Sequence, residues 1–218
     1  MMEDLYQYEN ELRKKNIKVI AGVDEVGRGP LIGNVVAACV VLPEDFYLEG
    51  LTDSKKLSEK KREKFYEVIK EKALAIGVGR VSEKEIDELN IYQATKKAME
   101  LAIVEANKQI KIEHVLIDAM PMEIDIPTTS IVKGDAKSIT IAAASVVAKV
   151  IRDREMYELS QIYPMYDLAN NKGYGTKKHI EAILKYGITK YHRLSYAPVY
   201  ENRNHLNELD EKKEVISK

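Results

Sequence analysis

Two adjacent carboxylates, Asp24 and Glu25, end an apolar run and stand directly before the turn Gly27-Arg28-Gly29. A strand end holds acidic side chains rigidly, and glycines let the following backbone approach a ligand closely. This combination favours metal-dependent chemistry on a phosphate backbone. For the two acids alone, a hairpin with a solvated acidic tip is the better interpretation, so the choice depends on the rest of the chain.

A nucleotide-binding loop is the main rival interpretation, because Gly27 and Gly29 begin a G-x-G pattern after a strand. The dinucleotide fingerprint needs a third glycine at position 32 and a helix that opens there. Position 32 is Ile32, and the β-branched run Gly33–Leu42 predicts a strand instead. The glycines therefore turn a predicted hairpin whose first strand carries the acids.

Two further carboxylates stand at comparable points of the chain. Asp118 ends the apolar run that begins at His114, and Asp153 lies where the apolar half of a predicted helix becomes polar. If the two acid-bearing strands are neighbours, the four acids converge, and their repulsion would raise their pKa values unless cations were bound. Carboxylate oxygens select Mg²⁺ or Mn²⁺, and the chain offers no Cys/His set for zinc. Two such ions about 3.5–4 Å apart can activate a water and stabilise the leaving oxygen of a phosphodiester.

The hydrophobic pattern predicts one main α/β core. Ser58 is expected to cap a helix, and Ser82 with Glu85 forms a capping-box pattern before another. The predicted strands are Lys18–Val23, Gly33–Leu42, Ala73–Val81 with apolar alternation at Leu74, Ile76 and Val78, His114–Asp118, and Thr128–Val132. The predicted helices are Met2–Lys15, Ser58–Lys72, the one after Ser82, Ile91–Ile110 and Ser138–Leu159. The last should be buried against the sheet, because its first half is apolar nearly all round.

Composition sets outer limits on the class of protein. The 218 residues are 45% hydrophobic and 32% charged, which suits one ordinary core with peripheral helices. No apolar run is long enough to span a bilayer, and the polar start is not a secretory signal. The single cysteine, Cys39, lies in an apolar strand, which fits a reducing cytoplasm. A monomer is expected, since no heptad seam or isolated apolar stripe marks a partner surface.

The net charge of −1 by itself gives no evidence for a polyanionic partner, and the charge distribution is more informative. Between Lys172 and Arg193 six basic residues stand against the single acid Glu181, with Tyr174, Tyr186 and Tyr191 interleaved. Such a surface can follow phosphates and stack on sugars or bases. A solvated helix face is an equally good interpretation of this region alone.

Six segments, in the same order along the chain, resemble the type 2 ribonuclease H family, ribonuclease HII. They are DEVGRGPLIGNVVAA (24–38), LTDSKKLSEKKRE (51–63), LIDA (116–119), KGDAKSITIAAASVVAKVIRDREM (133–156), KGYGT (172–176) and HRLSYAPV (192–199). The similarity runs from about Lys18 to Tyr200. Departures are small: Val26 stands where alanine is more usual, and 163–171 is less similar. Arg28 and the short approach of about 17 residues favour ribonuclease HII over ribonuclease HIII, which has an added N-terminal domain.

The resemblance implies a ribonuclease H-like fold, a mixed five-stranded sheet flanked by helices and followed by a helical C-terminal region. The expected organisation is a helical lead-in (1–17), a catalytic core (18–160), a substrate-holding region (161–200) and a charged tail (201–218), frayed or disordered. By the same resemblance Asp24, Glu25 and Asp118 are metal ligands and Asp153 is the fourth catalytic carboxylate. The turn Gly27-Arg28-Gly29 is expected to read a ribose 2′-hydroxyl. Tyr174 is expected to pack on the next deoxyribose.

The function implied is that of a metal-dependent endonuclease of the ribonuclease H type, with two Mg²⁺ or Mn²⁺ ions. It would hydrolyse the RNA strand of RNA–DNA hybrids and incise 5′ of ribonucleotides embedded in duplex DNA, leaving 3′-hydroxyl and 5′-phosphate ends. Only RNA carries a 2′-hydroxyl, so the discrimination needs donors and acceptors placed against that group. A non-catalytic hybrid-binding module is the alternative, although it has no need for acids at three chain positions. A small-molecule phosphohydrolase would leave the glycine turn and Tyr174 unexplained.

Several residues keep two interpretations. Asp53-Ser54-Lys55 and Asp135 to Ser138 could contact phosphates, but capping of the following helices is favoured, with Ser138 as an ordinary N-cap. His192-Arg193 could touch the nucleic-acid backbone or lock the C-terminal segment in place. The preferred metal, the relative activity on long hybrids and on single ribonucleotides, and protein partners stay open.

Overall fold

The computed structural model describes residues 5–210, which form two compact units. Within the described residues, the sheet unit comprises 5–26, 36–80 and 95–151. The helical unit comprises 27–35, 81–94 and 152–210. The chain passes between them several times, so each unit is built from segments distant in the sequence.

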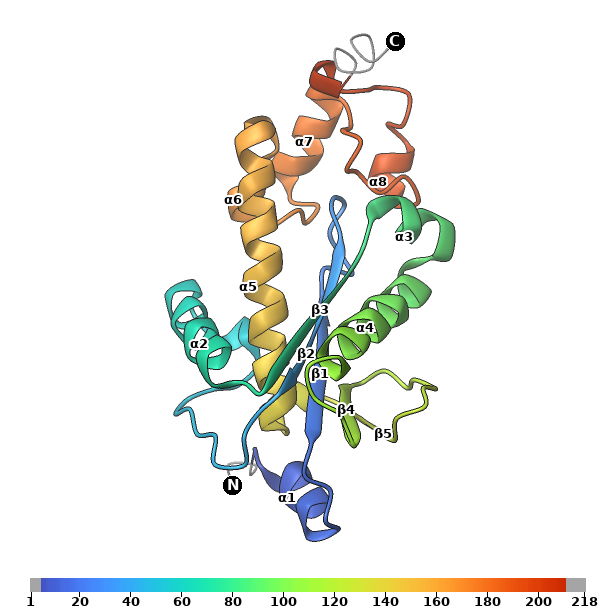
Figure 1. The fold of residues 1–218 in the computed structure, drawn as a ribbon. Helices are drawn as coiled ribbons and strands as arrows, with labels where there is room; N and C mark the ends of the chain where they lie inside the picture. The colour runs from blue at the N-terminus through green and yellow to red at the C-terminus, as the bar shows by residue number, and fades with distance from the viewer. Residues whose placement is uncertain (1–4, 211–218) are drawn as a thin grey trace. The chain divides into compact units, whose positions relative to one another are not determined.

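The sheet is mixed and five-stranded, in the order β3-β2-β1-β4-β5 (Figure 1). Its strands are β1 (Ile20–Val26), β2 (Val35–Val41), β3 (Ala75–Val81), β4 (His114–Asp118) and β5 (Thr128–Ile131). β1 pairs antiparallel with β2 and parallel with β4, which in turn pairs parallel with β5. This confirms the fold class expected from the sequence.

β1 is longer than the sequence pattern predicts. Its predicted end at Val23 is wrong, because Asp24 and Glu25 pair in register with Ala38 and Ala37 of β2. The polar side chains hid this continuation, since backbone pairing does not depend on side-chain polarity. The two acids are therefore fixed by a ladder of backbone hydrogen bonds on a strand and do not lie on a loose tip.

The helices follow the predicted order, with small differences at their ends. They are α1 (Gln7–Lys14), α2 (Glu59–Lys72), α3 (Glu83–Leu89), α4 (Ile91–Asn107), α5 (Ile139–Ile162), α6 (Leu168–Asn171), α7 (Lys177–Tyr186) and α8 (Ala197–Tyr200). Short 3₁₀ turns are η1 (Ser54–Lys56), η2 (Gly134–Ala136) and η3 (Pro164–Tyr166). The Ser58 cap and the Ser82–Glu85 capping box are both confirmed. The Ser138 hydroxyl accepts the Ile141 N–H at 3.2 Å, as expected of an N-cap.

Small residues let the helices of the sheet unit approach its strands closely. A Cβ added at Gly22 of β1 would lie 2.1 Å from the backbone carbon of Thr140, at the start of α5. Gly77 and Gly79 of β3 meet the backbone of α4 in the same way. The predicted apolar face of β3 is therefore not its most buried one: Leu74 is 52% exposed, whereas both glycines are buried. Close backbone approach requires glycine, which carries no hydrophobic signal.

Each unit has its own apolar core. In the sheet unit α5 packs with β2 and α2 around Val40, Phe65 and Ile69. Residues 141–148 of α5 are all buried, which confirms the prediction of a helix buried along its first half. In the helical unit Tyr163, Tyr166 and Ile183 are central. No helix within residues 5–210 has the length and apolar character needed to cross a membrane.

The described end of the chain belongs to the helical unit. Asp210 accepts hydrogen bonds from the Tyr163 hydroxyl at 2.7 Å and from the Lys190 N–H at 3.0 Å. Asn207 is buried and donates to the hydroxyl of Tyr166 and to the carbonyl of Tyr186. The charged tail predicted for 201–218 falls partly outside the described residues, since 211–218 are not among them.

Candidate active site

The pairing of β1 with β4 brings three of the predicted acids together. Val23 is level with Ile117 in the parallel register, so the next residues along the two strands, Asp24 within β1 and Asp118 at the end of β4, lie side by side. Asp24, Glu25 and Asp118 each offer one carboxylate oxygen, and these oxygens lie within 4.8 Å of one another. We call these three residues the acidic cluster. The sequence predicted this convergence only if the two acid-bearing strands are neighbours, and in the sheet they are.

Asp24 is the most buried member of the acidic cluster. Its side chain is buried, and this burial raises its pKa well above the usual range; the charges of Glu25 and Asp118 raise it further. A hydrogen bond from Ser145 of α5 and the Glu25 N–H, 2.7 Å from Asp24 Oδ1, act in the opposite direction. Burial and the neighbouring negative charges together therefore outweigh the two hydrogen bonds at this carboxylate.

Asp118 is oriented from the other side by the η2 turn. Its Oδ1 accepts the Gly134 N–H at 2.6 Å. Burial raises the pKa of Asp118, while this hydrogen bond and the nearby charge of Lys55 lower it. A Cβ at Gly134 would meet the side chain of Ile141 at 2.6 Å, so glycine allows the turn to close on the carboxylate.

The segment around η1 lies close to the acidic cluster. The Asp53 carboxylate accepts the Lys55 N–H at 2.9 Å, which confirms the capping interpretation. Ser54 is buried, and its hydroxyl lies 2.8 Å from that of Ser145, which also bonds Asp24. The pKa of Asp135 is raised to about 6, first by burial and then by the charges of Asp53 and Asp118.

The donor set of the acidic cluster fits a divalent cation with oxygen preference. All three ligands are carboxylates, and burial raises the pKa values of Asp24 and Asp118, so a bound cation would stabilise their charged forms. Magnesium and manganese match such hard oxygen donors better than zinc does. The residues present therefore suit the metal that the sequence predicts.

Asp153, the fourth predicted acid, lies on α5 in the helical unit and is 7% exposed. It is not part of the three-residue cluster. Its role in catalysis stays a prediction.

The glycine turn and Tyr174 lie together in the helical unit. A Cβ at Gly29 would stand 3.3 Å from Cε1 of the Tyr174 ring, so the ring lies against the turn. Tyr174 is 44% exposed, and Arg28 and Gly29 are exposed as well. Arg28, Gly29 and the Tyr174 ring are thus accessible to a ligand.

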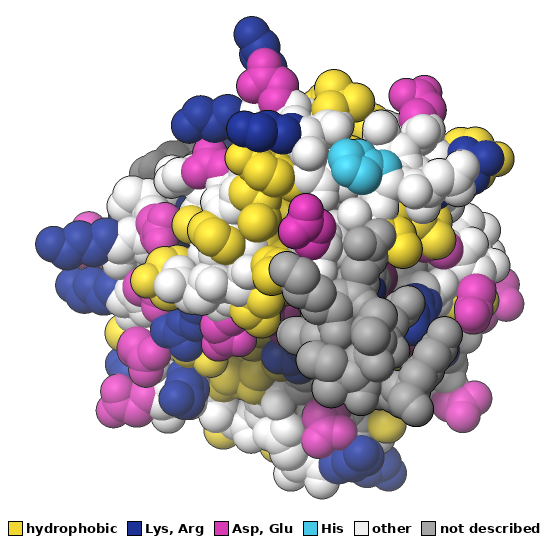
Figure 2. Space-filling model, turned by 90° about the horizontal axis from the view of Figure 1, so that it is seen from above, with side chains coloured by type: hydrophobic (Ala, Val, Ile, Leu, Met, Phe, Trp, Pro, Cys, Tyr) yellow, Lys and Arg dark blue, Asp and Glu magenta, His cyan; other side chains and the backbone are white. Residues whose placement is uncertain are grey.

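The basic region is less uniformly positive than its sequence suggests. Lys177 pairs with Glu181 at 3.8 Å, and Lys178 pairs with Asp167 at 3.6 Å. Lys185 stands over the ring of Tyr186. In Figure 2 the visible Lys and Arg side chains are interspersed with Asp, Glu and apolar groups, without forming one continuous basic patch on that face.

His192 and Arg193 are both buried. The Arg193 guanidinium donates to backbone carbonyls of the segment 27–33, and His192 Nε2 lies 3.1 Å from Nε2 of His179. Between the two interpretations left open by the sequence, these contacts match a locking role within the helical unit.

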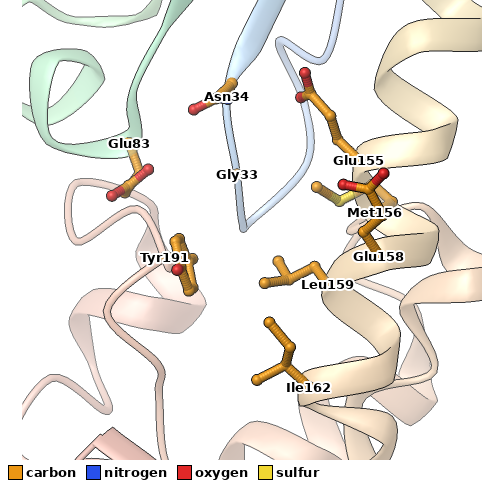
Figure 3. Close-up of a pocket in the computed structure, with 9 residues that line it drawn as sticks. All are labelled: Gly33, Asn34, Glu83, Glu155, Met156, Glu158, Leu159, Ile162 and Tyr191. Carbon is orange, nitrogen blue, oxygen red and sulfur yellow. The ribbon is translucent and has the colours of Figure 1, made fainter. Parts of the chain in front are cut away.

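A pocket of about 260 Å³ opens on another part of the helical unit (Figure 3). Three carboxylates line it, those of Glu83, Glu155 and Glu158, together with the apolar side chains of Leu159 and Ile162. No Lys or Arg is among the described residues that line it. Such a pocket repels phosphates, so it is a poor candidate for the nucleic-acid site.

Sequence reasoning missed Ser145 and Arg152 as members of the site region. Ser145 reads as one more small residue in an apolar helix, and only the fold shows its contact with Asp24. Arg152 carried a usable signal in the sequence, because a cation that directly follows an apolar helix segment is expected to need hydrogen-bond acceptors; in the structure it is fully buried.

Comparison with known proteins gives a consistent result. Residues 21–199 match the model of the family described as Ribonuclease HII. A curated Ribonuclease HII of Bacillus cytotoxicus is 61% identical over 196 residues, which cover 90% of this chain and 75% of that protein. The ribonuclease H2 of Pyrococcus horikoshii OT3 is 27% identical with a TM-score of 0.71, over 85% of this chain and 97% of that one. RNase HII of Archaeoglobus fulgidus, solved in complex with PCNA, is 27% identical with a TM-score of 0.69, over 82% and 95%.

Proposed function

Because the chain belongs to the ribonuclease HII family and is a nuclease, we propose that it cleaves the RNA strand of RNA–DNA hybrids and incises duplex DNA 5′ of embedded ribonucleotides. The products would carry 3′-hydroxyl and 5′-phosphate ends. The observation that carries this proposal is the acidic cluster, whose three carboxylate oxygens lie within 4.8 Å of one another. Charge of one sign gathered in this way destabilises a fold, so a binding module would have no use for it.

In this proposal Asp24, Glu25, Asp118 and Asp153 hold two Mg²⁺ or Mn²⁺ ions. Bound there, the ions would supply an activated water and stabilise the departing 3′-oxygen of the phosphodiester. The protein contributes a preformed arrangement: β1 and β4 fix the backbone of three acids, and Ser145 and Gly134 orient two of the carboxylates. Preorganised ligands need no rearrangement when the ions bind.

Substrate choice is assigned to the helical unit. The backbone of Gly27, Arg28 and Gly29 would contact the ribose 2′-hydroxyl, which DNA lacks. The Tyr174 ring would pack on the sugar that follows, leaving no room for a second hydroxyl there. The contact of the ring with Gly29 supports a joint role for the two elements. Cleavage would then be preferred where RNA gives way to DNA.

The deciding experiment is cleavage of a labelled DNA duplex that contains one ribonucleotide, with Mg²⁺, Mn²⁺ or a chelator. The wild type is compared with Asp118→Asn and with Tyr174→Ala. We expect a metal-dependent cut on the 5′ side of the ribonucleotide that Asp118→Asn loses, and reduced cutting of this substrate by Tyr174→Ala. Metal-independent binding without turnover would instead support a non-catalytic hybrid-binding module. An intact duplex alongside a cleaved long hybrid would remove the sugar-reading role and leave the nuclease.

A further inference from the structure

Two fully buried arginines, Arg152 and Arg193, lie behind the glycine turn of the helical unit. Their guanidinium groups donate to backbone carbonyls and to the Tyr196 hydroxyl, and within residues 5–210 neither forms an ion pair with a carboxylate. Burial and the charge of Arg193 lower the pKa of Arg152 to about 10, so it stays cationic at neutral pH. Two buried cations satisfied by carbonyls are costly, which indicates a specific task.

Arg193 holds the turn itself. Its guanidinium donates to the carbonyls of Gly27 at 2.7 Å, Arg28 at 3.0 Å and Gly33 at 2.7 Å. The Tyr196 hydroxyl also donates to the Arg28 carbonyl. Both ends of the segment 27–33 are therefore tied to one planar group.

Arg152 connects this turn to the segment that carries Tyr174. Its Nε and one terminal nitrogen donate to the carbonyls of Asn34 and Ile32, each at 3.2 Å. The other terminal nitrogen donates to the carbonyl of Lys172 at 2.9 Å. The same side chain also fills the space beside Gly27, where a Cβ would meet its Nε at 2.2 Å. Lys172 is only two residues from Tyr174, so Arg152 spans both halves of the proposed sugar site.

The direction of the carbonyls fixes the direction of the donors. In a trans peptide the N–H points opposite to the preceding C=O. Because the Gly27 and Arg28 carbonyls face Arg193, the N–H groups of Arg28 and Gly29 face away from it. Gly29 is exposed, and no acceptor among the described residues takes its N–H. The turn thus presents donors outward, with buried positive charge behind them.

We propose that Arg152 is a positioning residue for ribose selection: it holds the donor-bearing turn and the Tyr174 ring at a fixed separation, while Arg193 orients the turn. This inference deepens the proposed function and rests on it. Neither arginine would touch the reacting atoms. The choice of cleavage position, and not the chemistry, should therefore depend on Arg152.

The test uses one duplex in which a strand of four ribonucleotides continues into DNA, paired with a DNA complement. Wild type and Arg152→Lys are incubated with Mg²⁺, and the products are resolved by length. Lysine keeps the charge but cannot bond three carbonyls in a planar fork. We expect the wild type to cut mainly at the last ribonucleotide. In Arg152→Lys the ratio of cuts at that junction to internal cuts should fall about tenfold, the effect of losing one well-made hydrogen bond.

The ratio of products within one substrate does not depend on how much enzyme is active, so it separates positioning from stability. Ile183→Val, a core change in the same unit, is the matched control: it should lower stability and leave the ratio unchanged. If Arg152→Lys does not fold, Arg152→Gln takes its place, because the glutamine amide has two N–H donors where the guanidinium has five and so cannot bond all three carbonyls. A wild-type ratio in whichever of these two variants folds overturns the inference.

The proposed function and this inference fail in different ways. No metal-dependent cleavage by the wild type defeats the function itself. Cleavage of all four ribonucleotides at equal rates by the wild type leaves a nuclease but no selection for Arg152 to position.

Discussion

Replacing Asp118 by asparagine should make the protein more stable without divalent cations, while abolishing cleavage. Asparagine keeps the oxygen that accepts the Gly134 N–H at 2.6 Å and removes one negative charge from the acidic cluster. The raised pKa of Asp24, caused partly by the charge of Asp118, shows that this charge is unfavourable in the metal-free protein. Stability and activity therefore oppose each other at this position.

The size of the effect follows from the geometry. Two full charges 4.8 Å apart repel by about 3.5 kcal/mol at an effective dielectric constant of about 20. Partial protonation of Asp24, the nearby Lys55 charge and solvent screening reduce this value. We expect Asp118→Asn to raise the free energy of unfolding by about 1–3 kcal/mol, which increases Tm by several degrees for a chain of this length.

Thermal unfolding in chelator and in Mg²⁺ measures both parts of the prediction. In chelator the variant should melt above the wild type. Mg²⁺ should stabilise the wild type through binding to the folded state and have much less effect on the variant. Asp125→Asn, which removes an exposed acid of the same unit, is the charge-matched control and should change neither result.

Two outcomes would refute the reasoning. A lower Tm for Asp118→Asn in chelator would mean that the carboxylate makes favourable contacts that outweigh the repulsion. Equal stabilisation of both proteins by Mg²⁺ would place the metal elsewhere.

Three more predictions concern packing, pH and orientation. Gly22→Ala should destabilise the protein by about 1–3 kcal/mol in chemical denaturation and reduce cleavage, because the new methyl group would stand 2.1 Å from the backbone of α5. Burial lowers the pKa of His179 and brings that of His192 to about 3. In the unfolded chain histidine has a pKa of about 6.5, so below that pH the unfolded chain binds more protons than the native protein does. The free energy of unfolding should therefore fall by about 2 kcal/mol between about pH 7.5 and pH 5. NMR titration showing ordinary pKa values for both rings would contradict this. Ser145→Ala should weaken Mn²⁺ binding, measured calorimetrically, because Asp24 loses the hydroxyl that orients it, and unchanged affinity would argue against that role.

The parts of the fold that follow periodicity could be predicted from the sequence. The buried first half of α5, the capping box at Ser82 and the five strands all carry patterns that local physics reads directly. The end of β1 could not be placed, since Asp24 and Glu25 look like a polar tip while their backbone continues the ladder. Acidic residues that continue a paired strand contradict the rule that strands end where polarity begins, and such exceptions are expected at functional sites.

The sequence identified the three acids of the acidic cluster, but their proximity in space depends on the order of the strands in the sheet. No local pattern in the segments that contain Glu25 and Asp118 indicates that β1 and β4 are neighbours in the sheet. Likewise, from sequence Gly22 is only a residue that weakens a strand. In the structure the backbone of α5 lies so close to it that no side chain fits at this position. Long-range packing selects such residues, and a single sequence does not display it.

The two sets of candidate residues are held by different means, and this has a consequence for specificity. The acidic cluster stands on paired strands, where the ladder of backbone hydrogen bonds fixes every residue independently of its side chain. The turn at 27–29 has no ladder, so its carbonyls need other donors, and Arg193 supplies them while Arg152 ties the segment to that of Tyr174. Precision in the turn therefore rests on two side chains. We therefore expect single substitutions there to change sugar selection while the carboxylates of the acidic cluster keep their positions.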